Sequence, residues 1–213
     1  WGTVHGYGPF VRSDRNSSLL LLQAFMGVMV VLSMILGAEV NERKRSMARV
    51  RQMAVSDPLT GLANYRLLVD VLDAEIKRFG RTGRSFAVLI LDLDGLKKIN
   101  DTLGHLAGSR AICRVADTIR VLCRATDTAA RYGGDEFVIV LLETNYEGAQ
   151  LLSLRIAERL AKDIQYPPLT VSVGTALYPH DGGTVTEILR AADRSLYQKK
   201  RQPKKVPPYS MVI

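Results

Sequence analysis

The chain has 213 residues, of which 47% are hydrophobic and 23% are charged. That apolar content suffices for one globular domain with additional elements, and it excludes an intrinsically disordered chain. The formal net charge of +8 suits a partner that carries phosphate groups, but no aromatic residues interleave the basic runs at 43–51 and 199–205, so we expect no nucleic-acid partner.

Residues 19–38 contain no charged side chain. Twenty helical residues span roughly 30 Å, the thickness of a bilayer's hydrocarbon core, so we predict one transmembrane helix. A buried core helix and a signal peptide are the alternatives, but the run is too long and starts too late for a signal peptide. Residues 1–18 would form an extramembrane segment before this helix. The basic residues at 43–51 outnumber those at 12–15, which predicts that the part of the chain after the helix is cytoplasmic.

Residues 39–55 are polar and contain neither Gly nor Pro. We predict that the helix continues through them as a stalk, which could pair two chains. Ser56, Asp57 and Pro58 should end it, because proline disfavours helical geometry in its predecessor and has no N–H to donate. Because the chain begins at Trp1 without an initiating Met, we also expect it to be part of a longer protein.

Beyond Pro58, helical and strand patterns alternate. In chain order the predictions are a helix over 65–79, a strand over 86–94, a helix with an apolar stripe over 112–122, a hairpin around Gly133 and Gly134, a helix through 152–160, a strand over 169–177, and a helix opened by a capping box of Thr184 and Glu187. Helices between strands, with one hairpin in the middle, predict an α/β sandwich with a βαββαβ core.

Acidic residues gather at two strand ends. Asp92 and Asp94 are two apart and share a strand face, and Asp135 and Glu136 follow the glycine pair of the hairpin. If the hairpin lies beside the first strand, these acids form a hard oxygen site suited to Mg²⁺ holding a triphosphate. The glycines would let the backbone approach such a ligand. A charged, solvent-facing turn is the alternative that the spacing alone leaves open.

Five motifs together resemble the GGDEF family, the bacterial diguanylate cyclases. They are DPLTGLAN (57–64), DLDGLKKINDTLGH (92–105), YGGDEF (132–137), SVGTA (172–176) and ADRSLYQKK (192–200). The resemblance implies a polymerase-palm-like domain over 56–205 with a mostly antiparallel sheet, a tail over 206–213, and a place at the bacterial inner membrane. The opening residues are similar to the last helix of membrane-associated sensor domains.

The resemblance also implies a reaction. Each protomer of a homodimer binds one GTP, and each ribose 3′-hydroxyl attacks the α-phosphate of the opposite nucleotide, giving cyclic di-GMP and pyrophosphate. By the same resemblance, Asp92, Asp135 and the Leu93 carbonyl ligate Mg²⁺ or Mn²⁺. Glu136 is the other essential acid, and Asp94 supports the site or is simply a solvated strand end.

Further residues receive roles from the family pattern. Lys97, Lys200 and Lys204 would contact phosphate, although the family more often has arginine at the last position. Arg124 and Asp127 match the spacing of an inhibitory product site, with Arg159 as a weaker second contact. A helical ion pair between Arg124 and Asp127 is the alternative, worth only a few tenths of a kcal/mol.

The base pocket departs from the family. Asn100 matches the usual asparagine, but Ser109 stands where the family commonly has aspartate. A carboxylate suits the donors on guanine's pairing edge, whereas a hydroxyl can donate or accept. One good polar contact to a base discriminates by roughly 1–3 kcal/mol, so ATP could compete. The chain is similar here to hybrid promiscuous GGDEF enzymes, which also make cyclic GMP–AMP; strict GTP selectivity through Asn100 is the alternative.

Two other functional classes stay open. A domain of this kind can lose catalysis and act as a cyclic-dinucleotide receptor or interaction module, although such domains usually have a damaged turn motif, and here Asp92, Asp135 and Glu136 are all present. A basic membrane-surface adaptor is the other class. The intact motif favours an active enzyme.

Overall fold

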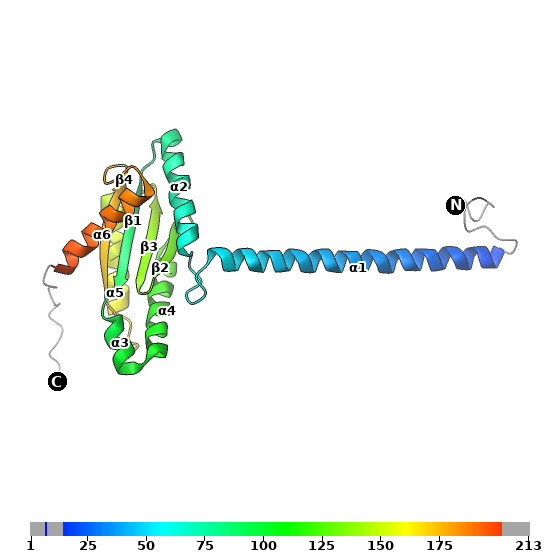
Figure 1. Ribbon diagram of the computed structural model, residues 1–213, viewed down its shortest axis with the longest axis horizontal. Coiled ribbons are helices and arrows are strands. Elements are labelled where there is room, and N and C mark those ends of the chain that lie inside the picture. Colours follow the sequence, from blue (N-terminus) through cyan, green and yellow to red (C-terminus); the bar gives the residue numbers. More distant parts are fainter. Residues whose placement is uncertain (1–6, 8–14, 202–213) are drawn as a thin grey trace. The chain divides into compact units, whose positions relative to one another are not determined.

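The computed structural model describes residue 7 and residues 15–201 (Figure 1). The chain divides into two compact units, one up to Gln52 and one from Met53 onwards, and each is described by itself. Lys204 and the predicted tail lie outside the described residues.

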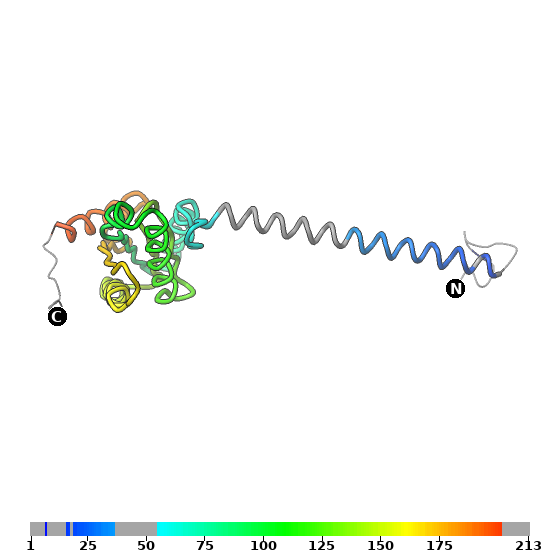
Figure 2. Tube along the Cα trace, turned by 90° about the horizontal axis from the view of Figure 1, so that it is seen from below, coloured from blue at the N-terminus to red at the C-terminus, as the bar shows by residue number. Residues whose placement is uncertain are grey.

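The first unit consists mainly of helix α1 (Arg15–Val55). Its segment Leu19–Leu36, drawn in blue in Figure 2, contains no charged residue and has a mean hydropathy of 2.5 and no buried residue. By length and composition this stretch could cross a membrane. The helix ends at Val55, immediately before Ser56, as the proline-containing sequence predicts.

The second unit is a mixed α/β domain, as predicted. Its elements are α2 (Tyr65–Thr82), β1 (Phe86–Leu93), α3 (Leu96–Leu103), α4 (His105–Leu122), β2 (Thr128–Gly133), β3 (Glu136–Leu142), α5 (Tyr146–Ala161), β4 (Val171–Tyr178) and α6 (Val185–Arg201). The strands form one sheet in the order β2-β3-β1-β4, and every neighbouring pair is antiparallel.

Helices cover both faces of the sheet (Figure 1). Alternate residues of β1 face opposite layers: Leu89 and Leu91 pack with α4 and α5, whereas Val88 and Ile90 pack with α2 and α6. Both layers are fully apolar at their centres, so burial of these two cores supplies the main stabilisation of the domain. At its carboxyl end β1 becomes polar, and Asp92 is its one partly exposed residue.

Helix α6 approaches β4 unusually closely at Gly174. A β-carbon built at this position would lie 2.1 Å from the Ala192 carbonyl oxygen and 2.4 Å from the Leu196 nitrogen. Only a residue without a side chain lets the helix backbone rest on the strand at this distance. The position of α6 along the sheet is therefore fixed by this contact.

The ends of the helices follow the predicted capping chemistry in part. The Thr184 hydroxyl accepts a hydrogen bond from the Glu187 N–H at 3.3 Å. The Glu187 carboxylate reaches back to the Gly183 N–H at 2.8 Å, one residue before the position that a standard capping box uses. The donor that it satisfies thus belongs to the preceding loop.

Two elements differ from the sequence prediction. Helix α3 was not predicted as a separate element, because it has only eight residues and none of its side chains is fully buried. Strand β4 begins at Val171 rather than at 169. The Thr170 hydroxyl donates instead to Asp94 at 2.8 Å, in the turn that follows β1.

Candidate active site

The acids of the first strand and of the hairpin meet at one edge of the sheet. Asp92 lies directly opposite Glu136 in the β1–β3 register. The Leu93 N–H donates to the Asp135 carbonyl oxygen at 3.0 Å, which extends the pairing by one residue. Because paired residues in antiparallel strands share a face, the side chains of Asp92 and Glu136 are cross-strand neighbours.

Lys200 provides a cation at this edge. Its Nζ lies 2.7 Å from an Asp92 carboxylate oxygen, and it comes from the last turn of α6. The Asp92 carboxylate is 15% exposed, so the pair is partly shielded from water. Gly174 determines where α6 lies, and α6 in turn delivers Lys200 to the acids.

Glu136 has an unusual electrostatic environment. Partial burial raises its pKa, and the neighbouring charges of Asp92, Asp135 and Asp193 raise it further, while Lys200 acts in the opposite direction. Desolvation and like charges both favour the protonated carboxyl. A carboxyl whose pKa is raised in this way is better suited to accept a proton than an ordinary exposed glutamate.

Asp94 ties the end of β1 to β4. Its carboxylate accepts hydrogen bonds from the Thr170 hydroxyl at 2.8 Å and from the Ser172 hydroxyl at 2.7 Å. Its own N–H donates to the Thr170 carbonyl oxygen at 3.0 Å. These contacts hold the turn between β1 and α3 in place. Asp94 is therefore hydrogen-bonded to β4 and to the residue before it, and is not a solvated strand end.

The hairpin turn is braced by Arg131. The Arg131 guanidinium donates to the Gly134 carbonyl oxygen at 2.7 Å and forms an ion pair with Asp57 at 3.2 Å. Asp57 also accepts from the N–H and hydroxyl of Thr60 at 2.8 and 2.7 Å. This bracing was not predicted from the sequence, because residues 57 and 131 are far apart along the chain.

The Asp57 carboxyl titrates abnormally. Burial alone raises its pKa, but hydrogen bonds from Thr60 and the charge and hydrogen bond of Arg131 outweigh burial, so the net pKa is lowered. The ionised form is therefore the one that the folded domain stabilises.

The two hairpin glycines leave open space beside the turn. A β-carbon at Gly133 or Gly134 would meet no atom within 4 Å, and Gly134 has a φ of +51°, which favours glycine. The backbone at this corner is thus accessible to a ligand.

The donors at this edge fit a magnesium ion that also binds substrate phosphate. Within the described part of the chain, no three His, Cys, Asp or Glu side chains gather as a metal site. Magnesium, however, is commonly held by one or two carboxylates together with phosphate oxygens and water. Asp92, Asp135 and the Leu93 carbonyl could supply the protein's share of such a shell.

The predicted base-binding residues lie on two helices that pack together. Asn100 is half-buried on α3, and Ser109 is half-buried on α4. The Asn100 carboxamide lies directly against Gly108, the residue before Ser109: a β-carbon there would be 1.9 Å from Asn100 Oδ1. Lys97 is exposed on the same short helix as Asn100.

The RxxD segment is a turn rather than part of a helix, because α4 ends at Leu122. The Asp127 carboxylate accepts from the Arg124 backbone N–H at 2.9 Å, and the Asp127 N–H donates to the Arg124 carbonyl oxygen at 3.0 Å. The alternative of a helical ion pair is therefore wrong. The other carboxylate oxygen of Asp127 is buried and has no hydrogen-bond partner within the described residues.

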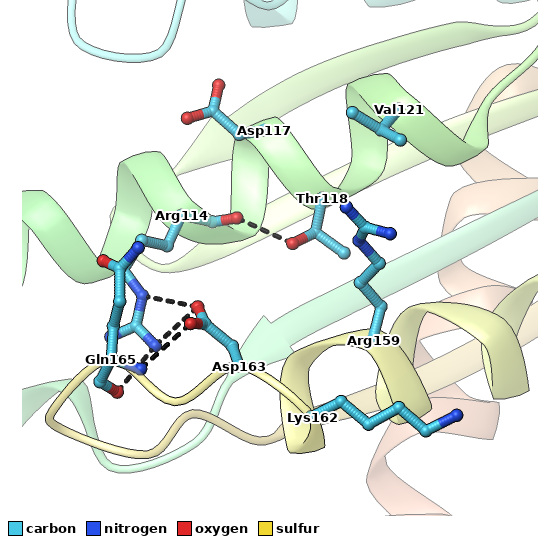
Figure 3. A pocket seen from close by; sticks show the side chains of 8 residues that line it. All are labelled: Arg114, Asp117, Thr118, Val121, Arg159, Lys162, Asp163 and Gln165. Atoms are coloured by element: carbon cyan, nitrogen blue, oxygen red, sulfur yellow. Dashed lines mark hydrogen bonds and ion pairs between the residues drawn. The ribbon is translucent and has the colours of Figure 1, made fainter.

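Arg159 lies in a separate cavity of about 430 Å³ between α4 and α5. Figure 3 shows Arg159 extending towards Thr118 and Val121, while Arg114 forms an ion pair with Asp163 at 2.7 Å. This cavity's lining contains neither residue of the RxxD turn.

We infer from the directions of α4 and α5 that Arg155 lies nearer than Arg159 to the RxxD turn. Helices α4 and α5 are antiparallel where they pack together, because Arg114 forms an ion pair with Asp163 and Val121 lines the same cavity as Arg159. One turn earlier on α5, Arg155 thus lies nearer the end of α4, where Arg124 follows.

A second cavity, of about 350 Å³, borders Glu136 on the α2 and α6 side. Tyr65 and Tyr132 line it, and their rings are in edge-to-face contact with centroids 5.3 Å apart. Burial raises the pKa of the Tyr132 hydroxyl. Two aromatic rings therefore lie beside the acidic edge, which the sequence pattern did not predict.

Residues 54–206 match the model of a protein family described as the GGDEF domain of diguanylate cyclases. The chain is 36% identical over 195 residues to MucR of Pseudomonas aeruginosa, a bifunctional diguanylate cyclase and cyclic di-GMP phosphodiesterase. It is 36% identical over 167 residues to NbdA of the same organism, a cyclic di-GMP phosphodiesterase.

The matches cover 86% and 76% of this chain but only 28% of MucR and 21% of NbdA. Among solved structures, the coiled coil and GGDEF domain of DgcB from Caulobacter crescentus, in complex with c-di-GMP, has a TM-score of 0.73 and 28% identity. That match covers 83% of this chain and 94% of the DgcB chain.

Proposed function

Because the chain belongs to the GGDEF family, we propose that it is a diguanylate cyclase that condenses two nucleoside triphosphates into a cyclic dinucleotide. The observation that carries this proposal is the pairing of Asp92 with Glu136, next to Asp135 and Lys200. A domain without catalytic function has no need to keep three acids together at a cost in charge repulsion.

In this reaction the ribose 3′-oxygen of one nucleotide forms a bond to the α-phosphorus of the other. The bond from that phosphorus to the bridging oxygen breaks, and pyrophosphate leaves. Glu136 would take up the proton of the attacking hydroxyl, and Lys200 and Lys97 would contact phosphate oxygens. Two such steps on facing protomers close the ring, so catalysis requires a homodimer.

Asp92, Asp135 and the Leu93 carbonyl would hold the divalent ion, which we propose to be Mg²⁺. The ion would neutralise the developing charge on phosphate when bound. Lys204 would add a further contact to phosphate; it lies outside the described residues.

We propose that the base pocket accepts adenine as well as guanine, giving cyclic GMP–AMP beside cyclic di-GMP. Asn100 and Ser109 lie on packed helices, and neither is a carboxylate that would repel the N1 acceptor of adenine. Strict GTP selectivity is the competing possibility.

A product assay tests both statements. The purified full chain in detergent would receive GTP, ATP and Mg²⁺, and products would be identified by mass spectrometry beside a Ser109→Asp variant. We expect both dinucleotides from the wild type and only cyclic di-GMP from the variant. Cyclic di-GMP alone from both proteins would contradict mixed specificity, and no product from either would contradict the cyclase.

A receptor function is the second candidate. Asp127 has a buried carboxylate oxygen without a hydrogen-bond partner among the described residues, and it lies next to Arg124; both features favour a dinucleotide site at the RxxD turn. In the cyclase this site would serve feedback inhibition. Dinucleotide binding by a wild type that releases no pyrophosphate would favour the receptor.

A further inference from the structure

Gly108 occupies a helical position at which a larger residue, such as alanine, would make the helix more stable. It is buried and is the fourth residue of α4, at the end of the first turn, where its N–H donates to the Gly104 carbonyl oxygen. Alanine is intrinsically more favourable than glycine in such a position. The glycine is not required by backbone geometry either, because Gly108 is absent from the glycines with positive φ, which are Gly61, Gly83, Gly95, Gly104 and Gly134.

The space beside Gly108 is filled by Asn100. A β-carbon at residue 108 would lie 1.9 Å from Asn100 Oδ1, 2.9 Å from its Cγ and 3.2 Å from Leu96 Cδ1. A separation below 3 Å cannot be tolerated, so the carboxamide and a β-carbon exclude one another. The Asn100 carboxamide thus occupies the volume that any other residue at 108 would need.

Asn100 lies on a short helix that has little buried surface of its own. None of the eight side chains of α3 is fully buried, so the helix depends on its contacts with α4 for its position. A recognition side chain needs a fixed rotamer to discriminate between ligands.

We propose that Gly108 is a positioning residue for base recognition: its missing side chain provides the seat that holds the Asn100 carboxamide against α4. This inference rests on the proposed function, because it assumes that Asn100 contacts the purine. Helix stability and base binding then make opposite demands on residue 108.

A double-mutant cycle tests the seat. The full chain in detergent would be prepared as wild type, Gly108→Ala, Asn100→Ala and the double variant. Isothermal titration would measure binding of a GTP analogue with a methylene bridge between the α- and β-phosphorus, and of inorganic triphosphate, both with Mg²⁺. Gly80→Ala is the control, since a β-carbon at that helical glycine meets nothing within 4 Å.

We expect Gly108→Ala to weaken binding of the analogue by about tenfold or more, the size of one lost polar contact to a base. Binding of triphosphate should not change. In the Asn100→Ala background the same substitution should leave the remaining affinity unchanged and raise Tm, because alanine favours the helix once the carboxamide is gone.

The positioning role of Gly108 would be contradicted if Gly108→Ala left the affinity for the analogue unchanged, or if it lowered the affinity equally in the wild type and in Asn100→Ala. Either result would leave the cyclase proposal unaffected. A wild type that binds neither the analogue nor triphosphate would overturn both. The control variant should bind like the wild type.

Discussion

Asp57 shows how one carboxylate links the pH to the stability of the domain. In the folded state its pKa is lowered, because the effects of Thr60 and Arg131 outweigh burial. Aspartate in an unfolded chain has a pKa of about 3.9. The stabilisation is therefore fully present above that value and is lost as the pH falls through the folded pKa.

We expect Asp57→Asn to lower the free energy of unfolding at pH 7 and to flatten its decline below about pH 4. Urea unfolding followed by circular dichroism between pH 3 and 7 would measure this. Asp73→Asn, at an exposed position of α2, is the control. Identical acid profiles for wild type and Asp57→Asn would contradict the assignment.

Arg131 needs its planar fork to contact both Asp57 and the Gly134 carbonyl. Lysine has a single ammonium and cannot make both contacts in this geometry. We expect Arg131→Lys to lose about 1–3 kcal/mol of stability and to lower cyclase turnover.

Urea denaturation and a pyrophosphate-release assay would measure these effects. Arg84→Lys is the matched control, because its ion pair with Glu143 is exposed on both sides and such pairs contribute about 1 kcal/mol at most. Equal losses from the two substitutions would argue against a special role of Arg131.

The sequence could predict the acids but not their supports. Asp92, Asp135 and Glu136 were predictable because strand periodicity fixes the face of each residue and the motif fixes the hairpin. The seat at Gly108 and the Arg131 contacts depend on residues brought together only by tertiary packing. Arg159 could not be separated from Arg155 without the direction in which α5 crosses α4.

At the scale of elements, the close contact between α6 and β4 is a point of weakness. We expect Gly174→Ala to cost about 1–3 kcal/mol, because the added methyl group would overlap the backbone of α6. It should also weaken nucleotide binding, since α6 carries Lys200.

Thermal unfolding and nucleotide titration would check both effects. Gly80→Ala provides a control of opposite sign: it adds the same methyl group in open space on α2 and should stabilise that helix slightly. A Gly174→Ala domain as stable as the wild type would mean that α6 can move without cost.

Most elements were predictable from hydrophobic periodicity and the turn residues between them. The two-sided covering of the sheet agrees with the apolar runs in the sequence, because β1, β3 and β4 bury residues on both faces. Helix α3 was missed because eight residues with no buried side chain leave a weak periodic signal.

At the scale of the whole molecule, the exposed apolar stretch of α1 predicts a membrane location. None of Leu19–Leu36 is buried, and that much apolar surface is unfavourable in water. We expect the full chain to sediment with membranes and to resist carbonate extraction.

A segment from Met53 onwards contains both cores and should remain in the supernatant. Immunoblotting of the two fractions would measure the distribution. Release of the full chain by carbonate would contradict a spanning helix.

Arg131 connects Asp57, two residues beyond the end of α1, to the corner that carries Asp135. The first residues of the domain and the hairpin corner are therefore joined by one side chain. We expect a rotation of the chain at Val55 to move the corner with it. We expect a signal that reaches the domain through α1 to change the orientation of the acidic edge while the edge itself keeps its shape. The orientation would then decide whether the edge faces that of a second protomer.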